Sequence, residues 1–428
     1  MEIPIKNLLH LATGRPPGQL VIQFTDKCNA RCPQCGMRVT NRFKRCTLAT
    51  EEVRRIIDAA ARKGFAAVSF TGGEPLIEPE ELISHLEYAD RAGIPYTRTG
   101  TNGFLFARAD GNGYMDNIKR LADRLAATAL RNFWISLDSA DPGVHETMRG
   151  LPGVVKGMEK ALPIFHERGL FPSANLGLNR NTGGNQAIPD RPSDPDDRAY
   201  LDDFEEAFYL ALQAFYDRIV SLGFTMVNTC YPMSVDQDEI EQQGLSAVYA
   251  ATSPDDVIRF TRAEKARLFR ALLRAVPEYR SRLRIFSPLV SLYSLARDYE
   301  PGGTPASYPC RGGHQFWFVD ARNGNTYPCG YRGGDGYGKF YNQNGNGRRS
   351  KPDCRGCDWE CFRDPSELMG PISEGFTSPL GLLKRLRRDP QRFRYWLEDL
   401  RYFRACGFFD GRRPPDGRKL EAFGPGRW

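Results

Sequence analysis

Three cysteines stand close together near the start of the chain. Cys28, Cys32 and Cys35 lie in "CNARCPQC", with three residues between the first two and two between the last two. Three thiolates can bind zinc if a fourth ligand joins them, or three of the irons in a [4Fe–4S] cluster. Cys46, eleven residues after Cys35, is the nearest candidate for a fourth zinc ligand, although this spacing is not a familiar one for zinc sites. The spacing therefore predicts a metal centre and leaves two kinds of centre open.

A second group of cysteines lies near the other end of the chain. Cys310 and Cys329 flank "DARNGNT", where Asn-Gly between apolar runs favours a β-hairpin that brings the two thiols together. "DCRGCDWEC" then adds Cys354, Cys357 and Cys361. Such a group can hold an iron–sulfur cluster or a zinc ribbon. Cys230 is interpreted as a buried structural thiol, as is Cys46 if it binds no zinc.

The elements that would position these groups alternate along the chain. Short apolar, β-branched runs predict six strands, at 19–25, 66–72, 95–102, 133–139, 172–179 and 224–230. Segments with helical apolar spacing separate them, at 50–64, 79–93, 115–130, 153–169 and 201–223. Six strand–helix units in a row predict an α/β fold with a parallel sheet, either a full or partial barrel or an open sheet.

Unusual residues follow the ends of the first four predicted strands. The cysteine loop follows the first strand, "TGGEP" (71–75) ends the second, "TNG" (101–103) ends the third and "SLDS" (136–139) ends the fourth. In parallel α/β folds the sites gather at the carboxyl ends of the strands. We therefore expect one site to be built from these segments.

Composition narrows the class of protein. The chain has 428 residues, a formal charge of +7 and no apolar run near the ~20 residues of a membrane span. Its first residues lack a signal-peptide pattern, which predicts a cytoplasmic protein with reduced thiols. From Arg348 onward 18 Lys and Arg face 12 Asp and Glu, but they alternate with the acids as on a solvated helix, so nucleic-acid binding is not expected.

Together these motifs resemble the radical S-adenosylmethionine (radical SAM) superfamily. The CxxxCxxC loop after a first strand and the GGEP turn one unit later carry the resemblance. It implies a partial (β/α)6 TIM-like barrel whose [4Fe–4S] cluster is held by Cys28, Cys32 and Cys35. The open iron would chelate the amino and carboxylate groups of S-adenosylmethionine. Reductive cleavage would then give a 5′-deoxyadenosyl radical that abstracts a substrate hydrogen.

The resemblance also implies which residues bind the cofactor. Gly72, Gly73, Glu74 and Pro75 would shape the methionyl site, and Ser136 and Asp138 would contact the ribose. Arg149 would bind the methionyl carboxylate, a role suited to a guanidinium. The implied set is Gly72, Gly73, Glu74, Pro75, Asn102, Ser136, Asp138 and Arg149. Gln34 stands where the family has an aromatic ring, and His145 is interpreted as an exposed loop residue.

The second cysteine group resembles the SPASM and Twitch auxiliary-cluster domains of this superfamily. The shorter form implies one auxiliary [4Fe–4S] cluster on Cys310, Cys329, Cys354 and Cys357, with Cys361 as a competitor for the fourth place. The expected organisation is an N-terminal extension (1–18), the radical SAM barrel (19–300) and an auxiliary-cluster domain with a basic helical tail (301–428).

The expected function is therefore radical chemistry on a substrate that the sequence does not name. Oxidation or bond formation on a small molecule is favoured over a peptide, because only 27 residues precede Cys28, too few for a leader-peptide recognition domain. A flavodoxin, ferredoxin or reductase would supply electrons. No side chain is assigned to the substrate radical, although Asn175, Asn179 and Asn228 are candidates. The alternative is a non-catalytic scaffold that binds zinc in both cysteine groups.

Overall fold

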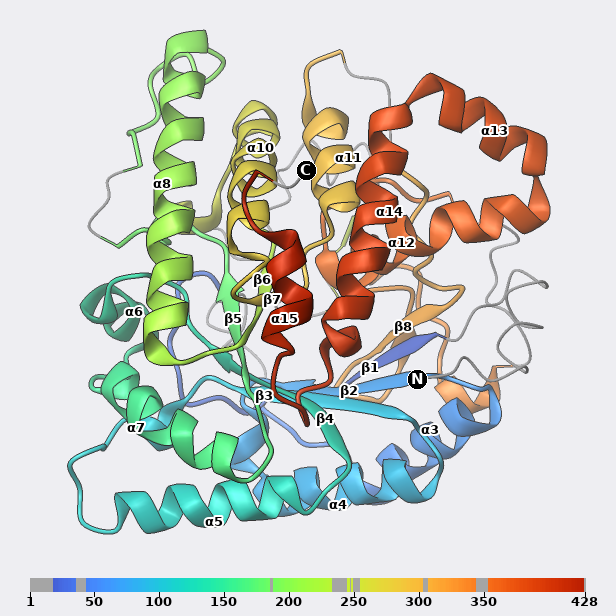
Figure 1. Cartoon of the computed structure of the whole chain (residues 1–428). Coiled ribbons are helices and arrows are strands. Elements are labelled where there is room, and N and C mark those ends of the chain that lie inside the picture. The colour runs from blue at the N-terminus through green and yellow to red at the C-terminus, as the bar shows by residue number, and fades with distance from the viewer. Residues whose placement is uncertain are drawn as a thin grey trace.

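A parallel sheet organises the chain, as Figure 1 shows for the computed structural model. The structure describes residues 18–35, 44–184, 188–232, 245–246, 248, 255–302, 307–343 and 353–426. The predicted extension at 1–18 therefore lies outside the described residues except for Gly18. Six strands follow in order: β1 (Gln19–Thr25), β2 (Ala67–Gly72), β3 (Tyr96–Thr101), β4 (Leu130–Ser136), β5 (Ser173–Gly177) and β6 (Met226–Cys230). All neighbouring pairs among them are parallel, so the predicted α/β partial barrel is confirmed.

Further strands extend this sheet at both edges. Its order is β7-β6-β5-β4-β3-β2-β1-β8-β9, where β7 is Arg284–Ile285, β8 is Phe316–Val319 and β9 is Thr326–Tyr327. β8 pairs parallel with β1, and β8 and β9 form the hairpin expected at the Asn-Gly turn, where Gly324 has a φ of +65°. The cysteine-rich part of the chain thus adds strands directly beside β1.

Helices connect the strands and cover the sheet. They are α3 (Thr50–Arg62), α4 (Pro79–Arg91), α5 (Tyr114–Ala126), α6 (Pro142–Arg149), α7 (Val154–Glu167), α8 (Arg198–Leu222), α10 (Arg262–Tyr279) and α11 (Leu289–Tyr299). In Figure 1, α3, α4, α5 and α7 lie below the sheet, and α8, α10 and α11 stand above it. Their apolar faces and the strand residues that point outward form one continuous core. Burial of these apolar side chains is the main force that holds the helices on the sheet.

The fourth strand begins three residues earlier than predicted. It covers 130–136 instead of 133–139, because its pairing with β3 already starts at Leu130 opposite Thr97. After Ser136 the chain leaves the sheet, and the backbone N–H of Asp138 donates to the ring of His145 over 3.1 Å. The expected "SLDS" strand end is therefore a buried loop.

The end of α14 (Pro390–Ala405) and the segment that follows it pack against the amino ends of β4 and β6. Four helices make up this part of the chain. They are α12 (Glu360–Thr377), α13 (Pro379–Arg388), α14 itself and α15 (Gly417–Leu420). Tyr402, Phe403 and Phe409 pack with Met226 at the start of β6 in a separate apolar cluster. The tail also bonds to a strand start, since Gly411 N donates to the carbonyl of Arg131 over 2.8 Å.

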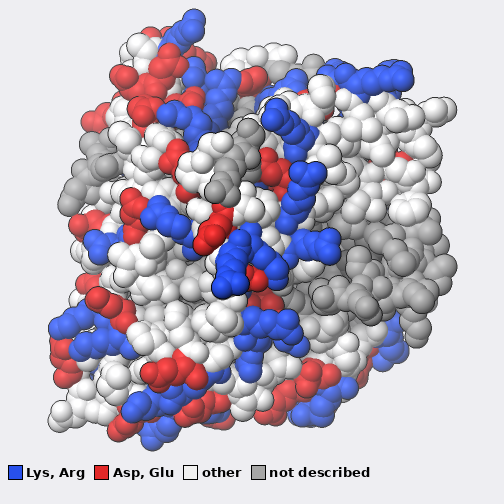
Figure 2. Space-filling view, viewed as in Figure 1, with Lys and Arg blue, Asp and Glu red and all other residues white. Residues whose placement is uncertain are grey.

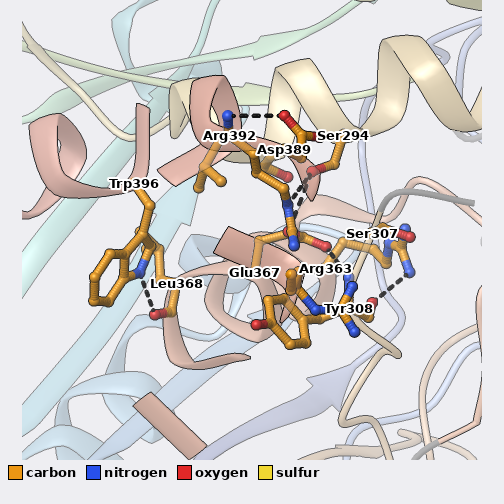
Figure 3. A network of polar contacts seen from close by, with 12 residues as sticks. Ser294, Ser307, Tyr308, Arg363, Glu367, Leu368, Asp389, Arg392 and Trp396 are labelled. Carbon is orange, nitrogen blue, oxygen red and sulfur yellow. Dashed lines mark hydrogen bonds and ion pairs between the residues drawn. The ribbon is translucent and has the colours of Figure 1, made fainter. Parts of the chain in front are cut away.

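Buried polar contacts fix α12 against α11 and α14, as Figure 3 shows. Arg392 of α14 forms an ion pair with Glu367 of α12 and donates to Ser294 of α11 over 3.1 Å. Trp396 donates to the carbonyl of Leu368 over 2.9 Å. Because α12 begins directly after the "DCRGC" cysteines, these contacts also set where that segment lies.

Charges of both signs are mixed over the face seen in Figure 2. Lys and Arg side chains gather over α14 and α15, with acidic side chains among them. Among the described residues, every helix is too short or too polar to serve as a transmembrane span.

Candidate functional site

The "TGGEP" segment packs directly on the backbone that leads into the three-cysteine loop. Gly73 N donates to the carbonyl of Thr25 over 3.0 Å, and Glu74 N donates to that of Lys27 over 2.8 Å. A Cβ on Gly72 would lie 2.4 Å from the Thr25 oxygen, and one on Gly73 would lie 2.3 Å from the Lys27 oxygen. Real side chains do not tolerate such distances, so the two glycines are required by this close backbone contact.

Glu74 joins this segment to the end of the third strand. Its fully buried carboxylate accepts from Thr101 Oγ1 over 2.8 Å and from Asn102 N over 2.5 Å. Burial raises the pKa of Glu74 to about 7, against the opposing effect of these donors. Asn102 in turn places Nδ2 at 2.9 Å from Asn29 Oδ1 and 3.9 Å from the sulfur of Cys28. Glu74 and Asn102 therefore position the cysteine loop from two strands.

The last two thiols of the loop lie at the two ends of a tight turn. Cys35 N donates to the carbonyl of Cys32 over 3.2 Å, and Arg31 N donates to that of Arg149 over 3.3 Å. Burial raises the pKa of Cys32 to about 12, opposed by the nearby Arg149 charge. In the described part of the chain no three His, Cys, Asp or Glu side chains already stand in metal-binding geometry. The chemistry of the donor set nevertheless fits a cluster, because three thiolates would be gathered beside a cation.

A buried ion pair lies behind the loop. Arg149 Nε donates to Asp138 over 2.7 Å, and the Asp138 carboxylate is fully buried. The same carboxylate accepts from Gln34 Nε2 over 2.6 Å and from Gly177 N over 3.1 Å. Burial alone would raise the pKa of Asp138, but Arg149 and His145 bring it below its usual value. Asp138 therefore holds Arg149, Gln34 and the end of β5 together, and Arg149 keeps further N–H donors for an anion.

The interpretation of His145 as an exposed loop residue is wrong. His145 is fully buried on α6, where its Nδ1 accepts from Asp138 N. Burial lowers the pKa of His145 to about 4. No local pattern indicates this burial, because it arises where the chain after β4 folds back onto α6. Gln34, which we did not assign to the site, is also part of it through Asp138.

Polar residues continue across the next strands. Ser136, buried at the end of β4, pairs in register with Asn175 of β5, and Asn175 with Asn228 of β6. Asn228 Nδ2 donates to Asn175 Oδ1 over 2.7 Å. Asn179 instead donates to the carbonyls of Asp138 and Gly177, so it supports the loop after β4.

The second cysteine group is gathered into one buried cluster. Cys310, Cys329 and Cys357 are buried together, with Cys354 packed against them. Cys310 N donates to the carbonyl of Cys354 over 2.7 Å. Burial raises the pKa of Cys310 to about 11, and the neighbouring Cys354 adds to the rise. Cys361 lies on α12 beside Glu360, with Sγ 3.3 Å from Oε1.

Cys46 and Cys406, two of the three remaining thiols, have their sulfur contacts with other residues. Cys46 contacts the carbonyl of Ala321 at 3.4 Å. Cys406 is buried among Tyr402 and Phe409 at the amino ends of the strands. Both therefore pack as ordinary side chains in the described structure.

Comparison with known proteins identifies the first part of the chain. The model of the radical SAM superfamily matches residues 22–180. A probable GTP 3′,8-cyclase of Thermococcus kodakarensis is 30% identical over 175 residues, 40% of this chain and 52% of that protein. A PqqA peptide cyclase of Granulibacter bethesdensis is 28% identical over 172 residues, 40% of this chain and 42% of that protein. The chain spans about half the length of the curated relatives it matches.

Solved structures give a looser likeness. Streptococcus suis SuiB bound to S-adenosylmethionine has a TM-score of 0.47 and 17% identity, with coverage of 76% of this chain and 64% of that chain. Native anSMEcpe with bound AdoMet has a TM-score of 0.47 and 14% identity, with coverage of 89% of this chain and 100% of that chain.

Proposed function

Residues 22–180 form a radical SAM domain, and from this premise we propose that the chain cleaves S-adenosylmethionine at a [4Fe–4S] cluster bound by Cys28, Cys32 and Cys35. The observation that carries the proposal is the convergence of four strand ends on this loop. Glu74 and Asn102 hold it from one side, and the Asp138–Arg149 pair holds it from the other. Such a fixed polar surround suits a charged cofactor at a metal centre.

Each residue of the site has a distinct task in this proposal. The bound cluster and S-adenosylmethionine would supply a 5′-deoxyadenosyl radical on reduction. Arg149 would bind the methionyl carboxylate through the N–H groups that Asp138 leaves available. The carbonyl groups around Gly72, Gly73 and Pro75 would accept from the methionyl ammonium. Ser136, at the end of β4, would meet the ribose, and the buried Asp138 would act on it only through its neighbours.

The four gathered thiols of Cys310, Cys329, Cys354 and Cys357 would hold an auxiliary [4Fe–4S] cluster. Their common burial and the tie between Cys310 and Cys354 support this ligand set. Cys361 packs against the same cluster and also lies beside Glu360, so it remains the competitor for the fourth place. Four gathered thiolates would also suit zinc, so the metal content has to be measured.

The substrate would enter the polar interior of the barrel. Small-molecule chemistry remains our first proposal and peptide chemistry the second, with a flavodoxin, ferredoxin or reductase as the electron source. The similar proteins include a GTP cyclase and a peptide cyclase, so both kinds of substrate occur among their names. Asn175 and Asn228, bonded to each other across β5 and β6, offer amide groups to either.

Anaerobic reconstitution tests the proposal. We expect about eight irons per chain, from two four-iron clusters, and 5′-deoxyadenosine that depends on reductant. Replacement of Cys28, Cys32 and Cys35 together by Ala should remove about four irons and abolish cleavage, because one cluster loses its protein ligands. Cys46→Ala is the matched control and should keep both. Zinc bound in place of iron, without cleavage, would refute the proposed function.

A further inference from the structure

Two thiols and a carboxyl group meet beside the end of β6, where Cys361 also packs against the second cysteine group. Cys361 Sγ lies 3.3 Å from Glu360 Oε1. Cys230, at the end of β6, contacts Asn175 Oδ1 at 3.5 Å. Burial raises the pKa of its thiol, and the nearby Glu360 adds to the rise. Glu360 is only 4% exposed, and its Oε2 has no hydrogen-bond partner among the described residues. A buried acceptor without a partner is costly, so a ligand that donates to it would be stabilised here.

This group lies between the two cysteine groups. Cys230 pairs in register with Gly177, so the two stand on adjacent strands ~5 Å apart. Gly177 in turn contacts the cysteine loop, since a Cβ there would lie 3.9 Å from Gln34 Cγ. On the other side, Cys361 lies in the first turn of α12, four residues after Cys357. A substrate near Cys230 would therefore lie within reach of a radical formed over the first loop.

We propose that Cys230 donates a hydrogen atom to a carbon-centred substrate radical, with Glu360 and Cys361 as its supporting groups. The inference rests on the proposed function. A thiol suits this task because its S–H bond is weaker than the C–H bond it forms. Glu360 suits the support role because burial raises its pKa, so that it is able to hold a proton at this site. The amides of Asn175 and Asn228 would orient a substrate that carries a carbonyl or carboxylate group.

The atoms and electrons of this step balance. The bound cofactor would supply a radical that removes a hydrogen atom from the substrate, and Cys230 would give its thiol hydrogen to the resulting substrate radical to form a new C–H bond. The sulfur radical left on Cys230 then takes one electron from a ferredoxin- or flavodoxin-class reductant and one proton from Glu360. The substrate ends at its original oxidation level, so the net change would be an inversion or rearrangement.

Deuterium transfer tests the proposal without a known substrate, because the 5′-deoxyadenosyl radical is itself carbon-centred and, with no substrate present, should take its hydrogen from Cys230. The reconstituted enzyme is reduced with dithionite in D2O with S-adenosylmethionine alone, and the 5′-deoxyadenosine is analysed by mass spectrometry. Solvent deuterium exchanges onto a thiol but not onto carbon, so the wild type should yield a product with one deuterium. Cys230→Ser should lower the deuterated fraction at least fivefold, because an O–H bond is too strong to donate. Cys406→Ser, at a buried thiol elsewhere, should leave it unchanged.

The outcomes separate this inference from the function on which it rests. Absence of 5′-deoxyadenosine from the wild type would overturn both. Product formed without deuterium, or an equal deuterated fraction in Cys230→Ser, would overturn the inference alone. If Cys230→Ser loses iron, Cys230→Ala provides the same comparison with no new polar group in the barrel.

Discussion

Asp138→Asn is the substitution whose effect follows most directly from the structure. Asp138 accepts from Arg149 and Gln34 on one oxygen and from Gly177 on the other. An amide has one acceptor oxygen, so in either orientation its NH2 group faces at least one of these donors. The change also leaves the Arg149 guanidinium, only 8% exposed, without its counter-charge. Removing one partner of a buried ion pair costs ~3–5 kcal/mol, and we expect a loss of stability in that range.

A second buried pair supplies the control for this prediction. Asp399 Oδ1 lies 2.6 Å from Arg280 Nη2 and also accepts from Leu289 N. None of these three residues belongs to the cysteine loop or to the segments that hold it. Asp399→Asn should lose a comparable free energy of unfolding, measured on the metal-free protein by urea denaturation at pH 7. Only Asp138→Asn should also weaken binding of S-adenosylmethionine to the reconstituted enzyme. A loss below ~1 kcal/mol, or equal weakening of binding in both variants, would refute the proposed role of this pair.

Two further predictions follow from buried groups near the loop. Because burial holds the pKa of His145 at about 4, below its unfolded value of 6.5, the unfolded chain binds the extra proton between these pH values. Stability should then fall by ~3 kcal/mol as pH drops from 6.5 to 4, a loss that His145→Gln should not show in urea denaturation. Gly73→Ala should displace the backbone of Lys27, which should lower the free energy of unfolding by ~1–3 kcal/mol and reduce the iron content. Gly334→Ala, with open space around it, should change neither quantity. If the difference in stability between His145→Gln and wild type stays the same from pH 6.5 to pH 4, the first prediction is wrong. A Gly73→Ala protein with full iron content would contradict the second.

The sequence predicted the barrel well because its signals are local. Alternating apolar residues and helical spacing placed β1 and β5 within two residues of their observed ends. The order of the first six strands followed from short right-handed crossovers between neighbours in the chain. The pairing of β8 with β1 had no such signal, because these strands are about 300 residues apart and no repeat links them. The sequence therefore predicted the strands of the barrel but not the continuation of its sheet.

The site was predicted in the same uneven way. The cysteine loop, Glu74 and Arg149 belong to short motifs, and each lies near the end of the strand or helix that its motif follows. Gln34 and His145 acquire their places only through Asp138, whose carboxylate and backbone meet side chains from other elements. The spacing of residues in the sequence does not predict such a contact. A residue that acts through a partner is visible only once both are folded.

Cys230 is a residue whose surroundings could not be predicted from a short motif. In the sequence it is a lone thiol at the end of a strand, and a packing role was the reasonable interpretation. In the fold its neighbours come from β5 and α12, and one of them, Glu360, follows the second cysteine group. α12 reaches the barrel because Arg392 and Trp396 of α14 hold it there, so the chemistry beside β6 depends on the last helices of the described chain. Mutations of that tail should therefore alter the thiol site before they alter the cluster loop, since the loop is held by β2, β3 and α6 instead.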